Sequence, residues 1–141
     1  MDFFKKGLNK VKDKVSQADL EKKLVEATPN ETGFANISLL NEISSRTDDS
    51  EQCKIIVKYC MKLLTLKPKF WKKILRTLQL IEHVVKTGSQ NFVEQMKDER
   101  DKIRDLHNFT YEDDDKDRGE QSKPLFIIIK IYSKRKIKIY F

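Results

Sequence analysis

Five basic residues crowd one short stretch of the chain, with no acidic residue among them: Lys67, Lys69, Lys72, Lys73 and Arg76. They begin a segment, residues 67–89, whose apolar residues recur every three or four positions, as in an amphipathic helix. Cations at the start of a helix oppose the helix dipole, so helix stability does not explain them. The same helix end attracts anions. The pattern therefore predicts that this helix start binds an anionic ligand, phosphate above all.

A second basic segment, residues 1–15, carries a narrow apolar stripe. The apolar residues are spaced four, three and four positions apart, with Phe3 at the edge: Phe4, Leu8, Val11 and Val15. A short basic amphipathic helix of this kind can lie in a lipid interface with its apolar face down. The alternative is a first helix packed on the domain, or a frayed terminus. The membrane interpretation predicts the inserted residues: Phe3, Phe4, Leu8 and Val11.

The chain has 141 residues, a formal net charge of +7 and a pI of about 9.3. This length predicts one domain with a single core. Positive charge gathers in residues 1–15, 62–76 and 123–141, whereas residues 98–117 are rich in acids. Such a directed field favours an acidic partner, either membrane lipid or nucleic acid. Nucleic acid is disfavoured because the aromatic residues fall on apolar stripes and no recognition motif is present.

Residue types for catalysis or metal binding are sparse. His83 and His107 lie far apart, and neither adjoins a cysteine or serine motif. The sequence has no glycine-rich phosphate loop, no zinc-ligand spacing and no calcium-binding loop. We therefore expect no enzyme, no metal site and no cofactor.

Cys53 and Cys60 are the two cysteines, and their spacing places them on one helix face, too far apart for a disulfide. We interpret them as reduced core residues of an intracellular protein. We find no secretory signal peptide and no apolar stretch long enough to span a bilayer. These features predict a cytoplasmic protein.

Helical periodicity extends to about residue 106. Capping residues predict where helices begin: Ser16, with Asp19 completing a capping box, then Asn36, the run 48–50, and Ser89. The helices are expected to end near Thr28, Arg46, Leu66, Gly88 and Leu106, with Gly88 in the left-handed conformation. Ile37, Leu40 and Ile43 are expected to face inward. Successive helices joined by short loops predict an all-α stack or superhelix.

The tail from Pro124 has a different pattern. Its β-branched and aromatic residues alternate in part with polar ones, which by itself favours a strand. If it were exposed on a helical domain, such a segment would be prone to aggregation. It adds a membrane contact, packs on the helices, or is an altered terminus in place of a last helix.

Several short motifs occur in a characteristic order: Glu26-Ala27-Thr28-x-Asn30, Ser38-Leu39-Leu40-x-Glu42-Ile43, Trp71 with two basic residues, Leu80, Val85-Lys86-Thr87-Gly88-Ser89, Phe109-x-Tyr111 and Asp117-x-Gly119. On these motifs the chain resembles the epsin N-terminal homology (ENTH) domain over residues 16–119. Trp71 and the downstream Lys86 to Ser89 form the most specific pair.

The resemblance implies a right-handed, ENTH/VHS-like superhelix of about seven to eight helices that binds phosphoinositide headgroups, commonly phosphatidylinositol 4,5-bisphosphate. In that family an N-terminal segment folds on meeting the lipid, helps to form the headgroup pocket and inserts its apolar face. Three regions follow for this chain. They are a lipid-responsive amphipathic helix at 1–15, an ENTH-like helical domain at 16–119, and an atypical basic and apolar tail at 120–141.

Carried over by position, the family's phosphoinositide-binding residues fall on Asn30, Lys69, Lys73 and Arg76. Lys5, Lys6 and Lys10 join them by charge and position alone. Val25 and Leu63 stand where the family often has arginine, with Lys22, Lys23 and Lys62 nearby as candidate substitutes. Thr32 to Ala35 replaces the family's Pro-Trp-Gly-Pro turn.

Together these features predict a phosphoinositide-binding peripheral membrane module of an epsin-like adaptor in clathrin-linked vesicle formation and endocytosis. We expect it to be a monomer in solution, on the plasma membrane or on Golgi and endosomal membranes, with clathrin, adaptor or SNARE proteins as further partners. The alternative is a helical protein-interaction scaffold for trafficking cargo or SNAREs that binds lipid weakly. The loss of basic residues at Val25 and Leu63 favours this alternative.

Overall fold

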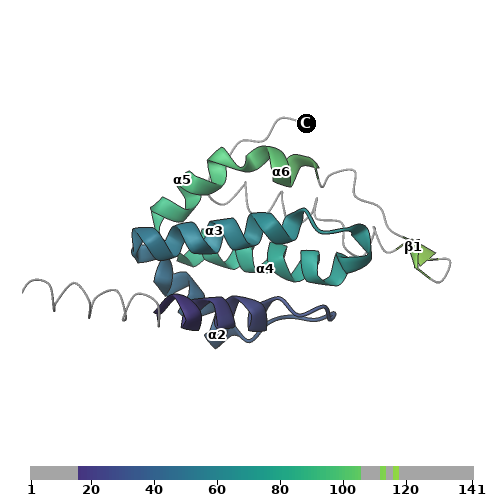
Figure 1. The fold of residues 1–141 in the computed structure, drawn as a ribbon, viewed down its shortest axis with the longest axis horizontal. Helices are drawn as coiled ribbons and strands as arrows, with labels where there is room; N and C mark the ends of the chain where they lie inside the picture. Colours follow the sequence, from purple (N-terminus) through teal and green to yellow (C-terminus); the bar gives the residue numbers. More distant parts are fainter. Residues whose placement is uncertain (1–15, 106–111, 114–115, 118–141) are drawn as a thin grey trace, which may run out of the picture.

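The computed structural model describes residues 16–105, 112–113 and 116–117 (Figure 1). Six helices make up most of this part: residues 16–27, α2 (Ile37–Ser45), α3 (Ser50–Leu64), α4 (Trp71–Thr87), α5 (Gln90–Asp98) and α6 (Arg100–Asp105). Two 3₁₀ turns, η1 (Arg46–Asp48) and η2 (Pro68–Phe70), precede α3 and α4. The predicted all-α class is confirmed. The predicted inserting segment 1–15 and the tail from Pro124 lie outside the described residues.

A short pair of strands lies within the acid-rich run 98–117. Strand β1 (Glu112–Asp113) pairs antiparallel with β2 (Lys116–Asp117), and Glu112 faces Asp117 in the register. The hairpin involves no other described strand. It therefore leaves the helical architecture unchanged.

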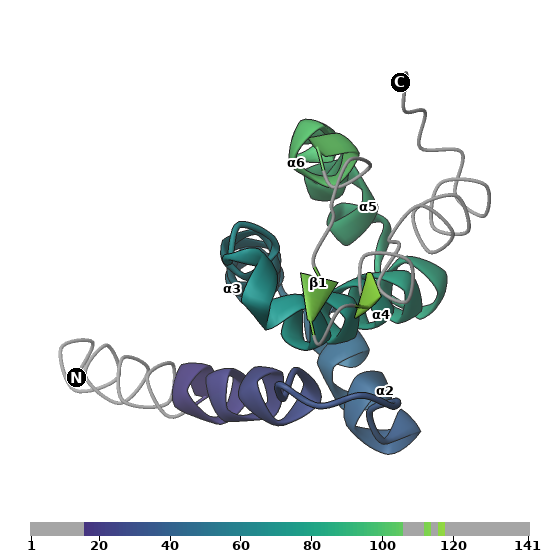
Figure 2. The same cartoon turned by 90° about the vertical axis from the view of Figure 1, so that its right-hand side faces the viewer.

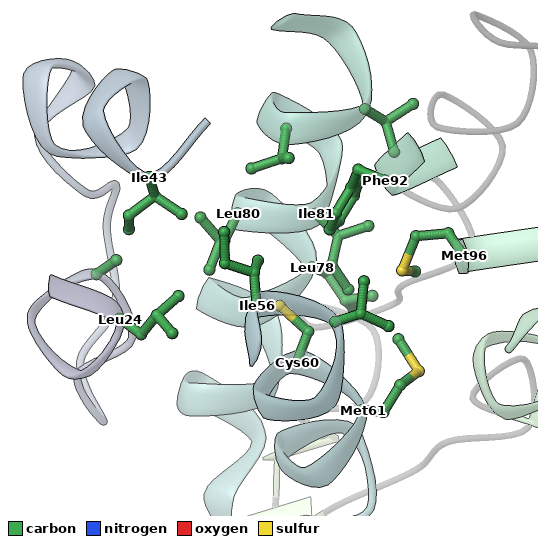
Figure 3. Close-up of a cluster of buried hydrophobic side chains, with 14 of the residues drawn as sticks. Leu24, Ile43, Ile56, Cys60, Met61, Leu78, Leu80, Ile81, Phe92 and Met96 are labelled. Carbon is green, nitrogen blue, oxygen red and sulfur yellow. The ribbon is translucent and has the colours of Figure 1, made fainter. Parts of the chain in front are cut away.

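Helix α4 lies at the centre of the described fold. It contacts α2 on one side and α3 and α5 on the other, and α3 also contacts α5 and α6 (Figures 1 and 2). Its buried residues cover more than one face of the helix: Trp71, Ile74, Arg76, Thr77, Leu78, Leu80, Ile81, Val84 and Val85. Leu80 lies toward Leu24 and Ile43, whereas Ile81 lies beside Phe92 (Figure 3). This burial follows from the central position of the helix.

The two cysteines are part of this core. Cys53 and Cys60 are free thiols and both are fully buried in α3. Burial raises the pKa of the Cys60 thiol to about 12 and also raises the pKa of Cys53. The interpretation of both as unbridged core residues is confirmed.

Two of the predicted helix caps are confirmed. The Asn36 side chain accepts a hydrogen bond from the Ser38 N–H at 2.8 Å, and Asp49 accepts from Glu51 and Gln52 at the start of α3. Each satisfies backbone donors that have no partner within the helix. Local sequence was sufficient here because cap and donor lie two or three positions apart.

The capping box at Ser16 is wrong. Residue 16 is already helical, and its hydroxyl accepts a hydrogen bond from Arg46 Nη1 at 3.2 Å. The Asp19 carboxylate accepts from Arg46 Nη2 at 2.7 Å. Both side chains therefore join the first helix to η1, a contact that local sequence does not reveal.

The helix expected over residues 90–106 is also wrong in extent, because it divides at Glu99. The Glu99 N–H bonds to the Met96 carbonyl at 3.1 Å, a three-residue step that tightens the last turn of α5. Ser89 precedes α5 as expected but does not cap it. Its hydroxyl donates to the Thr47 carbonyl at 2.7 Å.

Ile37 is exposed rather than inward-facing, with 60% of its surface accessible. The buried residues of α2 are Leu40, Ile43 and Ser44. Ile37 lies within about 20° of the buried Ser44 around the helix axis, so its exposure follows from its place as the first residue of α2 and not from helical periodicity.

Gly88 ends α4 for a reason other than the expected left-handed backbone. Its φ of −84° and ψ of −173° are extended values open to any residue. A Cβ atom at this position would lie 2.7 Å from the Val84 carbonyl oxygen and 2.9 Å from Thr47 Oγ1. Glycine is required here because α4 and η1 approach too closely for a side chain.

We predict that Gly88→Ala destabilises the fold by about 1–3 kcal/mol, because the added methyl group must displace backbone and side-chain atoms. Urea denaturation measures this as a lower midpoint at an unchanged slope. Ser38→Ala, an exposed position of α2, is the control and should shift stability by less than about 0.5 kcal/mol. Equal stability of the Gly88→Ala variant and the parent would contradict the steric account.

Candidate functional site

The basic residues at the start of α4 share one side of the helix. Lys72, Lys73 and Arg76 fall within about 100° of one another around the axis, and Lys69 precedes them in η2. Exposure rises toward the helix start, from the buried Arg76 through the half-buried Lys72 and Lys73 to the exposed Lys69. The side therefore presents cations to solvent at the start of the helix, where the helix dipole also favours an anion.

The lysines of this side are available to an external anion. Within the described part of the chain, Lys69, Lys72 and Lys73 form no ion pair. Two of them lie near aromatic rings. Lys69 Nζ is 5.1 Å from the Phe70 ring centroid and Lys72 Nζ is 5.7 Å from the Trp71 ring. Such contacts orient a lysine without neutralising its charge.

Arg76 connects this side of α4 to the loop over residues 28–36. Its Nε donates to the Glu31 carbonyl and its Nη2 to the Thr32 carbonyl, each at 3.1 Å. The side chain is only 7% exposed. Hydrogen bonds to a charged group are worth about 1.5–3 kcal/mol each, so the guanidinium holds the loop against the helix.

Gly33 allows the loop to approach Arg76. Its φ of +108° lies in the region that favours glycine. A Cβ atom there would lie 3.4 Å from Arg76 Nη2. The backbone turn that follows the two accepting carbonyls therefore depends on this glycine.

The structure describes four of the predicted site residues, which lie along the start of α4 and in the loop that Arg76 holds. Asn30 is exposed and directly precedes Glu31, whose carbonyl Arg76 holds, and Lys73 lies one helical turn before Arg76. Lys69 lies beyond Lys73 at the open end. Their contact with a headgroup stays a prediction. The remaining candidates lie outside the described residues: Phe3, Phe4, Lys5, Lys6, Leu8, Lys10 and Val11.

The two positions without a basic residue differ in environment. Val25 is 55% exposed, whereas Leu63 is 5% exposed within the core. Of the candidate substitutes, Lys23 is bound to Glu42 at 3.0 Å, and this hydrogen bond is the main cause of its raised pKa. Lys22 and Lys62 are exposed and form no ion pair among the described residues.

A second basic groove, which our sequence analysis missed, lies between α3, α5 and α6. It has a volume of about 470 Å³ and is lined by Val57, Met61, Thr65, Gln95, Glu99 and the lysines Lys54, Lys58, Lys62 and Lys102. The spacing of four between Lys54, Lys58 and Lys62 is the signal that could have revealed it. Lys54 and Lys102 are paired with Glu51 and Glu99, so this groove is less strongly basic than its lysine count suggests.

The described residues offer no other chemistry of this kind. They hold no cluster of three or more histidine, cysteine or acidic side chains that would suit a metal ion. His83 bonds to the Asn41 side chain at 2.7 Å, and burial lowers its pKa. Within the same part of the chain, none of the helices has the length and apolar character needed to cross a bilayer.

Comparison with known proteins places the chain in a family. A model of the ENTH domain family matches residues 17–130. Epsin-2 of Rattus norvegicus is 30% identical over 128 residues, which is 87% of this chain and 22% of the relative. Epsin-3 of Saccharomyces cerevisiae is 30% identical over 112 residues, 79% of this chain and 27% of the relative. The chain thus spans about a quarter of the length of these curated relatives.

Solved structures show the same fold. A chain of the endocytic adaptor complex AENTH superposes with a TM-score of 0.76 and 23% identity, covering 96% of this chain and 99% of that one. The ENTH domain from epsin-2 in complex with phosphatidylinositol 4,5-bisphosphate gives 0.70 and 24% identity, covering 83% and 80%. ENTH domains are adaptors and not enzymes, so the expectation of a non-enzymatic domain is confirmed. The match over residues 17–130 and the shared helical fold show that this chain belongs to the ENTH domain family.

Proposed function

We propose that this chain is the phosphoinositide-binding peripheral membrane module of an epsin-like adaptor in clathrin-linked vesicle formation and endocytosis. The observation that carries the proposal is the row of Lys69 and Lys73 at the open start of α4, without an ion pair among the described residues and beside the loop held by Arg76. Polyphosphorylated headgroups match this arrangement because they carry several negative charges on one small ring. Phosphatidylinositol 4,5-bisphosphate is the proposed ligand.

Each residue of the site has a distinct role in this proposal. Lys69 and Lys73 contact phosphate groups as mobile point charges. The Asn30 side chain donates a hydrogen bond to a phosphate from the loop. Arg76 adds positive charge, while two of its N–H groups hold that loop. A headgroup would thus be bound between a rigid helix start and a fixed loop.

The N-terminal segment supplies the apolar part of the binding energy. Lys5, Lys6 and Lys10 contact phosphates, and the side chains of Phe3, Phe4, Leu8 and Val11 enter the bilayer. Each buried CH₂ contributes about 0.8 kcal/mol, and each lysine near an anionic surface about 1 kcal/mol. The inserted apolar side chains therefore contribute more binding free energy than the lysines once several of them are buried.

A protein-interaction scaffold for trafficking cargo or SNAREs is the second candidate. The observation that favours it is the pair Val25 and Leu63, which leaves two customary arginine positions apolar. Such a module would act in Golgi-to-endosome traffic with weak lipid binding.

We expect preferential binding to liposomes that carry phosphatidylinositol 4,5-bisphosphate over liposomes of matched total charge that carry phosphatidylserine. Lys73→Glu changes the local charge by two, so at about 1 kcal/mol per charge it should weaken inositide binding roughly 30-fold. Co-flotation at several lipid concentrations measures both effects.

Lys58→Glu is the matched control, because it makes the same charge change in the second basic groove. It should lower binding to both liposomes alike and retain the preference. Equal binding of the parent protein to both kinds of liposome would show that the site is a nonspecific basic surface and not a headgroup pocket. No binding to either would favour the scaffold.

Leu8→Gln should weaken liposome binding at least several-fold, because the polar amide resists transfer into the bilayer. Its thermal unfolding midpoint in solution should match that of the parent. Asn9→Gln, a neighbouring polar position, is the control and should bind like the parent. If Leu8→Gln bound equally well, insertion of the N-terminal segment would be excluded.

A further inference from the structure

Three large apolar side chains are exposed in the described part of the chain, and all belong to the loop 28–36 or to residues close to its ends. They are Val25 at 55%, Phe34 at 84% and Ile37 at 60% exposure. Single exposed apolar residues are common on protein surfaces and need no explanation. Phe34 differs because the backbone on both sides of it is fixed by contacts with the rest of the domain.

The backbone on each side of Phe34 is fixed. Before it, Arg76 binds the carbonyls of Glu31 and Thr32, and Gly33 turns the chain. After it, Ala35 packs on the core and Asn36 caps α2. Because the backbone is fixed on both sides, the exposed Phe34 ring projects from a rigid turn, and the loop loses little conformational freedom on binding.

The loop projects at the same end of the molecule as the proposed headgroup site. Figure 1 shows the loop after the first helix and the connection from α3 to α4 on the same side, and Figure 2 views that side directly. Arg76 touches the loop, and Lys73 lies about 4.5 Å earlier along α4. The loop that carries Phe34 therefore lies at the same end of the molecule as lysines that have no ion pair among the described residues.

We propose that Phe34 is a second, preformed membrane contact that enters the boundary between headgroups and acyl chains while Lys69 and Lys73 bind the phosphates. The nearby lysines indicate that Phe34 contacts an anionic lipid surface. An aromatic side chain near cations suits the interface of such a bilayer. The inference rests on the proposed membrane function. It adds a contact that exists before lipid binding and does not depend on the segment 1–15.

A fluorescent probe at position 34 tests the contact directly. Cys53 and Cys60 are fully buried, so a thiol-reactive environment-sensitive dye should label only the new thiol of a Phe34→Cys variant in the folded protein. Asn91→Cys, at an exposed position of α5, is the matched control. Each labelled protein is mixed with phosphatidylcholine vesicles containing phosphatidylinositol 4,5-bisphosphate, with and without a lipid whose acyl chain carries a spin-label quencher.

The proposal expects a blue shift and strong quenching of the dye at position 34, and neither at position 91. Phe34→Gln should weaken co-flotation roughly tenfold, as for the loss of one buried aromatic side chain, with an unchanged melting midpoint. Co-flotation without quenching at position 34 would overturn the Phe34 contact and leave the proposed function intact. Absence of co-flotation by the unlabelled parent protein would overturn both. A dye that is shifted but not quenched by the acyl-chain label would indicate a protein contact instead and exclude insertion.

Discussion

The burial of α4 is the constraint on which the other features depend. Its apolar residues contact α2 on one side and α3 and α5 on the other, so the helix cannot rotate or slide without exposing core. The fixed position of α4 determines where Lys69, Lys73 and Arg76 lie. The stability of the core and the geometry of the basic site are therefore consequences of the same packing.

Arg76 is the residue through which core and site are joined. A buried guanidinium is costly unless its donors are satisfied, and here two carbonyls from one loop supply partners. The loop 28–36 is held from outside by Arg76, and Gly33 supplies the positive φ that its turn requires.

The start of α4 shows a conflict between helix stability and function. Cations there are unfavourable for the helix dipole by about 0.3–1 kcal/mol each, and the apolar packing of the same helix offsets this cost. Lys69 and Lys73 remain accessible while Trp71 and Ile74 beside them are buried. Sites that break a local rule in this way are where function is expected.

The sequence by itself determined the all-α class, the buried stripes of α3 and α4, and the caps at Asn36 and Asp49, because these depend on residues within a few positions of one another. It also located the basic start of α4. Only the tertiary structure decided the role of Arg76, whose partners lie 45 and 44 positions away, and the need for Gly88 beside Thr47. It likewise decided that Ser16 and Asp19 bind Arg46 and that Ile37 faces outward. These contacts join distant segments, and periodicity and capping rules carry no information about which distant segments meet.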